Sequence, residues 1–306
     1  MSPADGGDAP ATRALLAVPG DPSTPTGGYG YARALLEHAP EAGLILDPWP
    51  LPEGFPHADA AVLEETAQRL SIVPAGWPVI VDGLALGVLP PETIRAVDAP
   101  VIALCHHPLG LETGLSPDRA AALMASERAA LAACAGVVAT SETTAWLLAR
   151  DFDVPRSRLA VARPGTARPE PRPASRRPGP PRLLSVGSLT PRKGHDVLVA
   201  ALSALADLDW ELAIVGPEDR DPACAAALRM QIAETGLSGR VTLTGAASGA
   251  RLAELYADSD VFVLASRLEG YGMAYAEAIA HGLPVVGTEA GAVAEATLGA
   301  ARLVPP

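Results

Sequence analysis

The chain has 306 residues, of which 49% are hydrophobic, and a formal net charge of −12. Its length favours two domains, each able to bury a core, and its acidity argues against non-specific binding to nucleic acid or anionic lipid. No segment approaches the roughly 20 apolar residues of a membrane span, and residues 1–8 lack the pattern of a secretory signal. Cys105, Cys134 and Cys224 are scattered and form no metal-type pair, so we expect buried, reduced thiols in a cytoplasmic protein.

Short apolar segments alternate with helical patterns through the first half of the chain. Continuous apolar strands that alternate with helices are typical of a parallel sheet covered on both faces. Ser116 and Pro117 mark the start of a long helix, as N-cap and first-turn residue. In chain order, we expect strands at 14–18, 44–46, 78–81, 101–105, 136–140 and 159–162, and helices at 29–38, 60–69, 91–96, 117–135 and 142–150.

A proline- and arginine-rich stretch divides the chain into domains 1–166 and 182–306, with residues 167–181 as the linker. Proline removes backbone donors and stiffens the chain, so we expect a solvated linker here rather than core or a phosphate patch. The alternating pattern then restarts. It predicts strands at 182–186, 211–215, 240–243, 261–265, 284–287 and 302–304, and helices at 195–205, 222–235, 248–257, 273–281 and 291–296.

Glu269 and Glu277 carry the strongest functional signal. Glu269 follows an apolar strand, and the spacing to Glu277 is close to two helical turns, so both carboxylates can face the same way from a helix N-terminus. Gly270 and Gly272 flank Tyr271 and let backbone N–H groups approach a ligand. Carboxylates can accept sugar hydroxyls, and N–H groups can bind phosphate. Together they suit a sugar nucleotide; the alternative is two solvated glutamates on a helix.

This segment resembles the E-x7-E signature of the retaining glycosyltransferases of family 4, and the resemblance runs through most of the chain. It implies an α/β protein of the GT-B type, with two doubly wound Rossmann-like domains that face a cleft. Family members normally continue with further helices after the position of Pro306, so the resemblance implies a second domain that is incomplete. It also implies a nucleotide-diphospho sugar as co-substrate, with no cofactor and no metal.

The turn after the first strand of the second half resembles the phosphate-contacting segment of the family. Cations are needed there because the charge on the leaving diphosphate rises as the glycosidic bond breaks. Lys193 matches the family lysine, Ser188 replaces the family arginine, and Arg192 is a possible substitute. Gly216 and Gly245 lie in loops at strand ends, where this fold binds ligands, and resemble the loops around the nucleobase.

The resemblance gives each residue of the E-x7-E segment a role. Glu269 would meet the hydroxyls of the donor sugar and counts as a catalytic candidate. Glu277 would hold the ribose. Backbone donors to sugar or phosphate would come from Gly270, Tyr271 and Gly272.

In the first half, Gly27 and Gly28 resemble the family loop that touches the donor phosphate or the acceptor. Arg33 stands where a dinucleotide-binding pattern needs its third glycine, so the evidence for NAD is weak. His106 fits the family histidine near the 6-hydroxyl of the sugar and is the other catalytic candidate, with His107 as the alternate. Adjacent histidines also suggest a metal, but their side chains diverge and no third ligand has a suitable spacing; a structural pair is a further alternative.

The implied activity is transfer of a sugar, with retention of configuration, to a saccharide, lipid or small-molecule acceptor. No side chain is an obvious nucleophile, so front-face displacement is implied. Glu295 matches a weaker family position and is expected to be structural. Two alternatives stay open: a sugar-nucleotide-binding module without activity, which the truncation and Ser188 favour, and a GT-B epimerase, which requires extra acid/base carboxylates.

Overall fold

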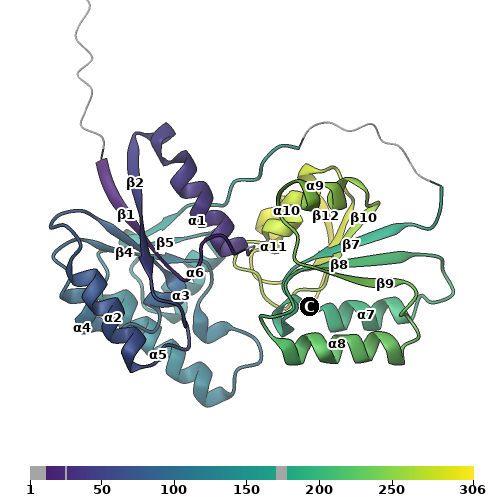
Figure 1. Cartoon of the computed structure of the whole chain (residues 1–306), viewed down its shortest axis with the longest axis horizontal. Coiled ribbons are helices and arrows are strands. Elements are labelled where there is room, and N and C mark those ends of the chain that lie inside the picture. Colours follow the sequence, from purple (N-terminus) through teal and green to yellow (C-terminus); the bar gives the residue numbers. More distant parts are fainter. Residues whose placement is uncertain (1–11, 25, 170–177) are drawn as a thin grey trace, which may run out of the picture. The chain divides into compact units, whose positions relative to one another are not determined.

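The computed structural model describes residues 12–24, 26–169 and 178–306. Pro25 and residues 170–177, within the predicted linker, lie outside the described residues. The chain is an α/β protein with two six-stranded sheets (Figure 1). It divides into two compact units. The first consists of Met1–Gly110, Ala121–Val138 and Leu148–Ala160, and the second of Leu111–Ala120, Ala139–Leu147 and Val161–Pro306.

The first sheet has the strand order β2-β1-β3-β4-β5-β6. Its central strands run parallel and are buried on both faces, which explains why they read as continuous apolar runs. The edge strand β2 extends beyond the predicted segment through Pro48 and Pro50, since proline is tolerated at an edge. The strands are β1 (Thr12–Pro19), β2 (Leu44–Leu51), β3 (Val79–Asp82), β4 (Val101–Cys105), β5 (Gly136–Ala139) and β6 (Leu159–Val161).

The helices of this half follow the predicted pattern, with one addition. Ser116 caps its helix as predicted, because the backbone N–H of Arg119 donates to its hydroxyl at 3.3 Å. The addition is α3, a single turn that begins where the Asp82 carboxylate accepts the N–H of Leu84 at 2.8 Å. The helices are α1 (Gly27–His38), α2 (Ala60–Ser71), α3 (Gly83–Leu86), α4 (Pro91–Arg95), α5 (Pro117–Ala133) and α6 (Glu142–Asp151), with 3-10 turns η1 (Ala39–Ala42), η2 (Leu109–Leu111) and η3 (Arg156–Arg158).

The second sheet has the order β12-β11-β10-β7-β8-β9, and all its paired strands are parallel. Its strands are β7 (Arg182–Val186), β8 (Glu211–Val215), β9 (Val241–Gly245), β10 (Val261–Leu264), β11 (Val285–Thr288) and β12 (Ala301–Val304). The helical segments are η4 (Pro191–Lys193), α7 (His195–Ser203), α8 (Pro222–Glu234), α9 (Gly249–Ala257), α10 (Met273–Ala280) and α11 (Val293–Thr297).

Helices cover both faces of the second sheet (Figure 1). One core cluster, which includes Val199 and Leu228, packs α7 and α8 on one face. Another, which includes Tyr256 and Tyr275, packs α9 and α10 on the other. Because the paired strands are parallel, the loops after β7, β8, β9 and β10 all lie at the carboxyl ends of the strands, where open α/β sheets bind ligands.

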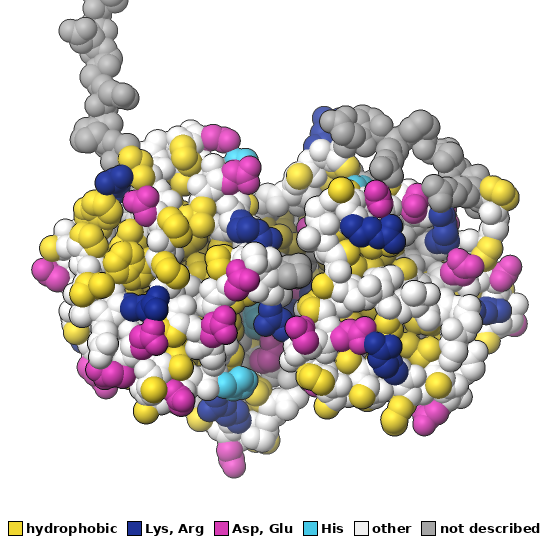
Figure 2. Space-filling model, viewed as in Figure 1, with side chains coloured by type: hydrophobic (Ala, Val, Ile, Leu, Met, Phe, Trp, Pro, Cys, Tyr) yellow, Lys and Arg dark blue, Asp and Glu magenta, His cyan; other side chains and the backbone are white. Residues whose placement is uncertain are grey.

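Within the described ranges, none of the helices has the length and apolar character needed to cross a bilayer. The same part of the chain has no group of three or more His, Cys, Asp or Glu side chains that could hold a metal ion. Cys105, Cys134 and Cys224 are free thiols; Cys105 and Cys134 are buried, as expected, whereas Cys224 is only partly buried, so that part of the expectation was wrong. On the face shown in Figure 2, acidic and basic side chains are interspersed rather than gathered into one charged patch.

Candidate functional site

The turn after β7 is shaped by glycines that make room for a lysine. Gly194 has φ +63°, and a Cβ there would lie 1.8 Å from the carbonyl oxygen of Ala265, so glycine is required. The stem of Lys193 crosses Gly187, where a Cβ would lie 2.9 Å from the lysine Cδ. The turn therefore places the ammonium group of Lys193 against the loop that follows β10.

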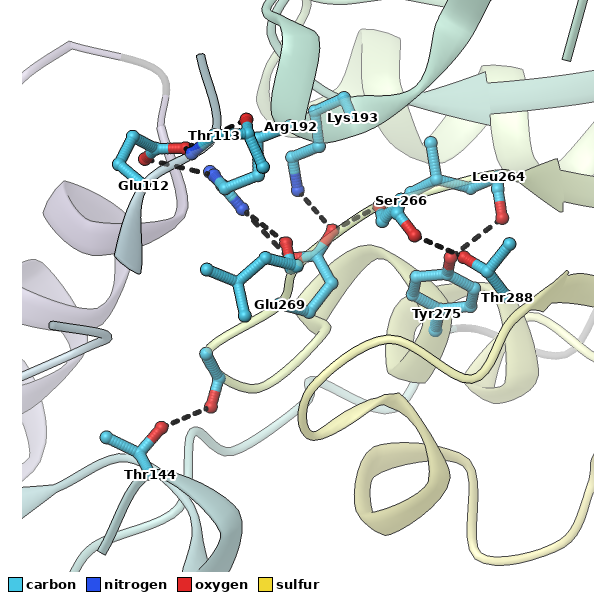
Figure 3. A network of polar contacts seen from close by, with 12 residues as sticks. Glu112, Thr113, Thr144, Arg192, Lys193, Leu264, Ser266, Glu269, Tyr275 and Thr288 are labelled. Atoms are coloured by element: carbon cyan, nitrogen blue, oxygen red, sulfur yellow. Dashed lines mark hydrogen bonds and ion pairs between the residues drawn. The ribbon is translucent and has the colours of Figure 1, made fainter. Parts of the chain in front are cut away.

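Lys193 and Arg192 both bind the carboxylate of Glu269 (Figure 3). The Lys193 Nζ donates to Oε1 at 2.7 Å, and an Arg192 nitrogen donates to Oε2 at 3.3 Å. The Ser266 hydroxyl also donates to Oε1, at 2.6 Å. Glu269 is buried, with only 6% of its side chain exposed. We call Arg192, Lys193 and Glu269 the ion-pair cluster.

Glu269 keeps its negative charge at neutral pH. Burial raises the pKa of Glu269, but the attraction of Lys193 and Arg192, with hydrogen bonds from Lys193 and Ser266, outweighs burial and leaves the pKa at about 2. Burial lowers the pKa of Lys193, and the attraction of Glu269 opposes that shift. One carboxylate thus holds two cations at the end of the second sheet.

Two short segments that cluster with the second unit contact the ion-pair cluster and the loop that follows β10. The Arg192 guanidinium donates to the carbonyl of Leu268 at 3.0 Å and lies 3.4 Å from the carboxylate of Glu112. The Thr144 hydroxyl donates to the carbonyl of Gly270 at 3.2 Å (Figure 3). The direction of Arg192, which the sequence left open, is therefore toward Glu269.

Glu277 lies on α10, and its carboxylate accepts the hydroxyl of Tyr256 at 2.9 Å. Burial raises the pKa of Glu277, while the hydrogen bond from Tyr256 and the attraction of Lys193 oppose the rise. Both glutamates of the motif thus interact electrostatically with Lys193. Gly272, with φ +106°, forms the N-cap of α10, and no acidic residue occupies the first turn of this helix. Tyr271, beside Gly272, is partly buried.

The predicted glycines after β8 and β9 lie next to the lysine turn. A Cβ on Gly216 would lie 1.9 Å from the carbonyl oxygen of Gly187 and 3.0 Å from the nitrogen of Ser188. The N–H of Gly216 donates to the carbonyl of Gly245 at 2.9 Å. Ser188 therefore belongs to the turn itself, and three successive strand ends are joined through main-chain atoms.

His195 supports the same turn and was not predicted as a site residue. Its Nε2 lies 3.2 Å from the carbonyl oxygen of Gly187, and its Nδ1 lies 3.4 Å from the hydroxyl of Ser185. Burial lowers the pKa of His195 to about 4, so the ring is neutral at pH 7. A lone histidine at the start of a helix gives no sequence signal for this role.

A second group of predicted residues lies in the first unit. A Cβ on Gly28, in the first turn of α1 after the exposed Gly27, would lie 3.7 Å from Nε2 of His106. The same nitrogen lies 3.1 Å from the Asp82 carboxylate, a distance that suits donation by the ring. Tyr31 meets the His106 ring edge-on at 5.5 Å. Asp82 was not predicted, and its carboxylate helps to orient this histidine.

His107 and Glu295 differ in their surroundings. His107 follows His106 on the same loop and is partly buried. Glu295 accepts the guanidinium of Arg163 at 2.6 Å and the N–H groups of Glu142 and Thr143, at 3.1 and 3.2 Å, all within the second unit. These contacts cap the start of α6, as expected for a structural residue.

Residues 180–306 match the protein family "Glycosyl transferases group 1". The chain is 31% identical over 184 residues to the D-inositol 3-phosphate glycosyltransferase of Nocardia farcinica, an alignment that covers 56% of this chain and 41% of that protein. It is 33% identical over 112 residues to the mannosylfructose-phosphate synthase of Agrobacterium fabrum, covering 35% of this chain and 25% of the relative. The chain therefore spans less than half the length of these curated relatives.

Solved glycosyltransferase structures share the fold. The sucrose-phosphate synthase of Thermosynechococcus elongatus superposes with a TM-score of 0.77 at 21% identity, over 96% of this chain and 86% of that one. A glycosyltransferase from Rickettsia africae superposes with a TM-score of 0.70 at 20% identity, over 96% and 84% of the two chains. The predicted GT-B type of α/β fold is therefore confirmed.

Proposed function

We propose that this protein is a retaining glycosyltransferase of family 4 that moves a sugar from a nucleotide-diphospho sugar to an acceptor hydroxyl. The observation that carries this proposal is the buried pair of Lys193 and Glu269, with Glu277 close enough to interact with the same lysine. The family match over residues 180–306 and the similarity to glycosyltransferases support it.

Lys193 and Arg192 would bind the diphosphate. Each has N–H donors beyond those that Glu269 uses, and positive charge here offsets the negative charge that develops on the leaving group. Glu269 would hold these cations in place and accept hydroxyls of the donor sugar. Since the cations come from side chains, we propose that transfer needs no metal and no cofactor. The backbone of residues 270–272, at the N-terminus of α10, would add donors to the sugar or the phosphate.

The nucleoside would lie beside the diphosphate, at the carboxyl ends of the same strands. Glu277 would accept the ribose hydroxyls, and the turns at Gly216 and Gly245 would flank the base, since ligands bind outside the carboxyl ends of such strands. In the first unit, His106 would meet the sugar 6-hydroxyl. The Asp82 carboxylate would fix the ring, and Gly28 leaves space in front of it.

We infer a front-face displacement, in which the acceptor oxygen bonds to the anomeric carbon on the face from which the phosphate leaves. The bond between that carbon and the phosphate oxygen breaks. The acceptor proton passes to the phosphate, and the products are a glycoside and a nucleoside diphosphate. The acceptor class stays open among saccharides, lipids and small molecules. Because two relatives are named for inositol phosphate and mannosylfructose phosphate, phosphorylated polyols and sugars belong in any test panel. We place the protein in the cytoplasm, where nucleotide sugars are available.

The test has a binding arm and a transfer arm. Titration calorimetry with UDP, GDP and ADP measures nucleotide affinity. A panel of nucleotide sugars and acceptors then measures release of the nucleoside diphosphate. We expect Glu277→Ala to weaken nucleotide binding and Glu269→Ala chiefly to slow transfer. Glu254→Ala is the matched control, since Glu254 is an exposed glutamate on α9 that pairs only weakly with Arg251, at 3.2 Å.

If both site variants behave like Glu254→Ala, the proposed roles are wrong. Nucleotide binding without transfer to any acceptor would favour a binding module instead. Interconversion of the nucleotide sugar itself, without an acceptor, would favour an epimerase.

A further inference from the structure

Glu127 is a buried carboxylate that the proposed chemistry does not use. It lies on α5 in the first unit, and only 2% of the residue is exposed. Its Oε2 accepts the backbone N–H of Leu109 at 2.9 Å, and its carboxylate also accepts the N–H of Gly110. Both donors belong to the 3-10 turn η2, which starts directly after Pro108.

The turn that Glu127 holds is pressed against α5. A Cβ on Gly110 would lie 2.3 Å from the Cγ of Met124 and 2.9 Å from its backbone nitrogen, so the turn has no room to shift toward the helix. Pro108, Leu109 and Gly110 are all buried. On the other side, Cys105 ends the buried strand β4.

His106 and His107 therefore lie on a short loop whose two ends are both held in place. The strand β4 holds the first end and Glu127 holds the second. The position of this loop determines the position of the His106 ring relative to the Asp82 carboxylate and to Tyr31, which the ring meets edge-on. A displacement of about 1 Å at such a group can cost on the order of a hundredfold in rate.

Holding this turn with an acid is costly. Burial raises the pKa of Glu127 to about 7, against the two backbone hydrogen bonds that lower it. An apolar side chain of similar volume would avoid that cost but would leave two buried N–H groups without acceptors. The carboxylate is suited to one task, which is to accept both amides at once.

We propose that Glu127 is a positioning residue that fixes the His106 loop through the amides of Leu109 and Gly110. Its effect on transfer rests on the proposed function, whereas its effect on the loop does not. The experiment therefore measures the two effects separately, on the full chain.

Hydrogen exchange resolved to single amides tests the loop. In Glu127→Ala, we expect protection of the Leu109 and Gly110 amides to fall on the order of tenfold or more, because both buried amides lose their acceptor. Glu127→Gln keeps one carbonyl acceptor and should give a smaller loss, which covers the case in which the alanine variant does not fold. Leu131→Ala is the control, since Leu131 is buried on the same helix but is not an acceptor for the turn. It should leave these two amides unchanged.

Transfer kinetics test the consequence. With the donor and acceptor that the wild type accepts, kcat of Glu127→Gln should fall on the order of tenfold while the affinity for UDP, GDP or ADP changes by less than about twofold. The proposal is overturned if the folded variants keep full protection at Leu109 and Gly110, or if Leu131→Ala loses it equally. If no donor supports transfer, the proposed function fails, but hydrogen exchange still decides the role of Glu127 in the loop.

Discussion

Replacing Lys193 with methionine should destabilise the second unit, because it leaves Glu269 buried beside a single cation. The pKa of Glu269 falls from its ordinary 4.5 to about 2 in the folded chain, although burial alone would raise it. A pKa difference of about 2.5 corresponds to about 3 kcal/mol in favour of the charged form. Arg192 supplies part of this, so we expect Lys193→Met to lower the free energy of unfolding by about 2 kcal/mol, below the roughly 3–5 kcal/mol lost when a buried charge is left with no partner.

A double-mutant cycle separates the pair from its surroundings. Glu269→Gln removes the negative charge and keeps the shape of the side chain, and it should also destabilise the chain because Lys193 then lacks its partner. The double variant buries neither charge. We expect it to lose less stability than the sum of the single variants, with a coupling energy of about 1–3 kcal/mol.

Urea unfolding at pH 7, monitored by tryptophan fluorescence, measures the free energy of unfolding of each variant. Trp210 reports on the second unit because it is buried in its core. The acid side gives a second reading. Because the folded pKa of Glu269 lies below 4.5, its stabilisation is complete above that pH and is lost as the pH falls toward about 2. Glu269→Gln should therefore show less acid-induced loss. A coupling energy near zero, with wild-type stability in Lys193→Met, would show that the Lys193–Glu269 pair does not stabilise the second unit.

Three further predictions concern the residues that support the site. Tyr256→Phe removes the hydroxyl that holds Glu277 and should weaken binding of the nucleoside diphosphate by about threefold to tenfold in calorimetry, since such a bond contributes about 1 kcal/mol; unchanged affinity would contradict this. Because the folded pKa of Glu127 is about 7 rather than 4.5, ionisation should lower wild-type stability as the pH rises between these values. Relative to Glu127→Gln, urea unfolding at pH 5 and pH 8 should show a change of up to about 3 kcal/mol, and a constant difference would contradict the assignment. Gly194→Ala would place a Cβ 1.8 Å from the Ala265 carbonyl oxygen and should lower the melting temperature by well over about 5 °C, whereas wild-type melting would show that the turn can shift.

The fold was largely predictable from the sequence because its elements have strong periodic patterns. Each predicted strand and helix is present in the described ranges, with shifts at the ends. The turn α3 was missed because a single helical turn has no periodicity; its start depends on the Asp82 cap. The edge strand β2 was cut short because Pro48 and Pro50 argue against a strand unless its place at the sheet edge is known.

The candidate site was predictable where a motif placed chemistry at a strand end. Lys193 and Glu269 were named from their loops, and the structure brings them to 2.7 Å. The direction of Arg192 and the roles of Asp82 and His195 were not predictable, because each depends on partners that the fold brings from other elements. The roles of the candidate site residues in nucleotide binding and sugar transfer stay predictions.

A crystal structure of the chain with the nucleoside diphosphate that binds best in calorimetry would show whether Lys193, Arg192 and Glu277 hold the donor. We expect the diphosphate within hydrogen-bonding distance of Lys193 and Arg192, the ribose hydroxyls on Glu277, and the base beside Gly216 and Gly245. A nucleotide bound elsewhere, without contact to Lys193 or Glu277, would show that these residues do not form the donor site.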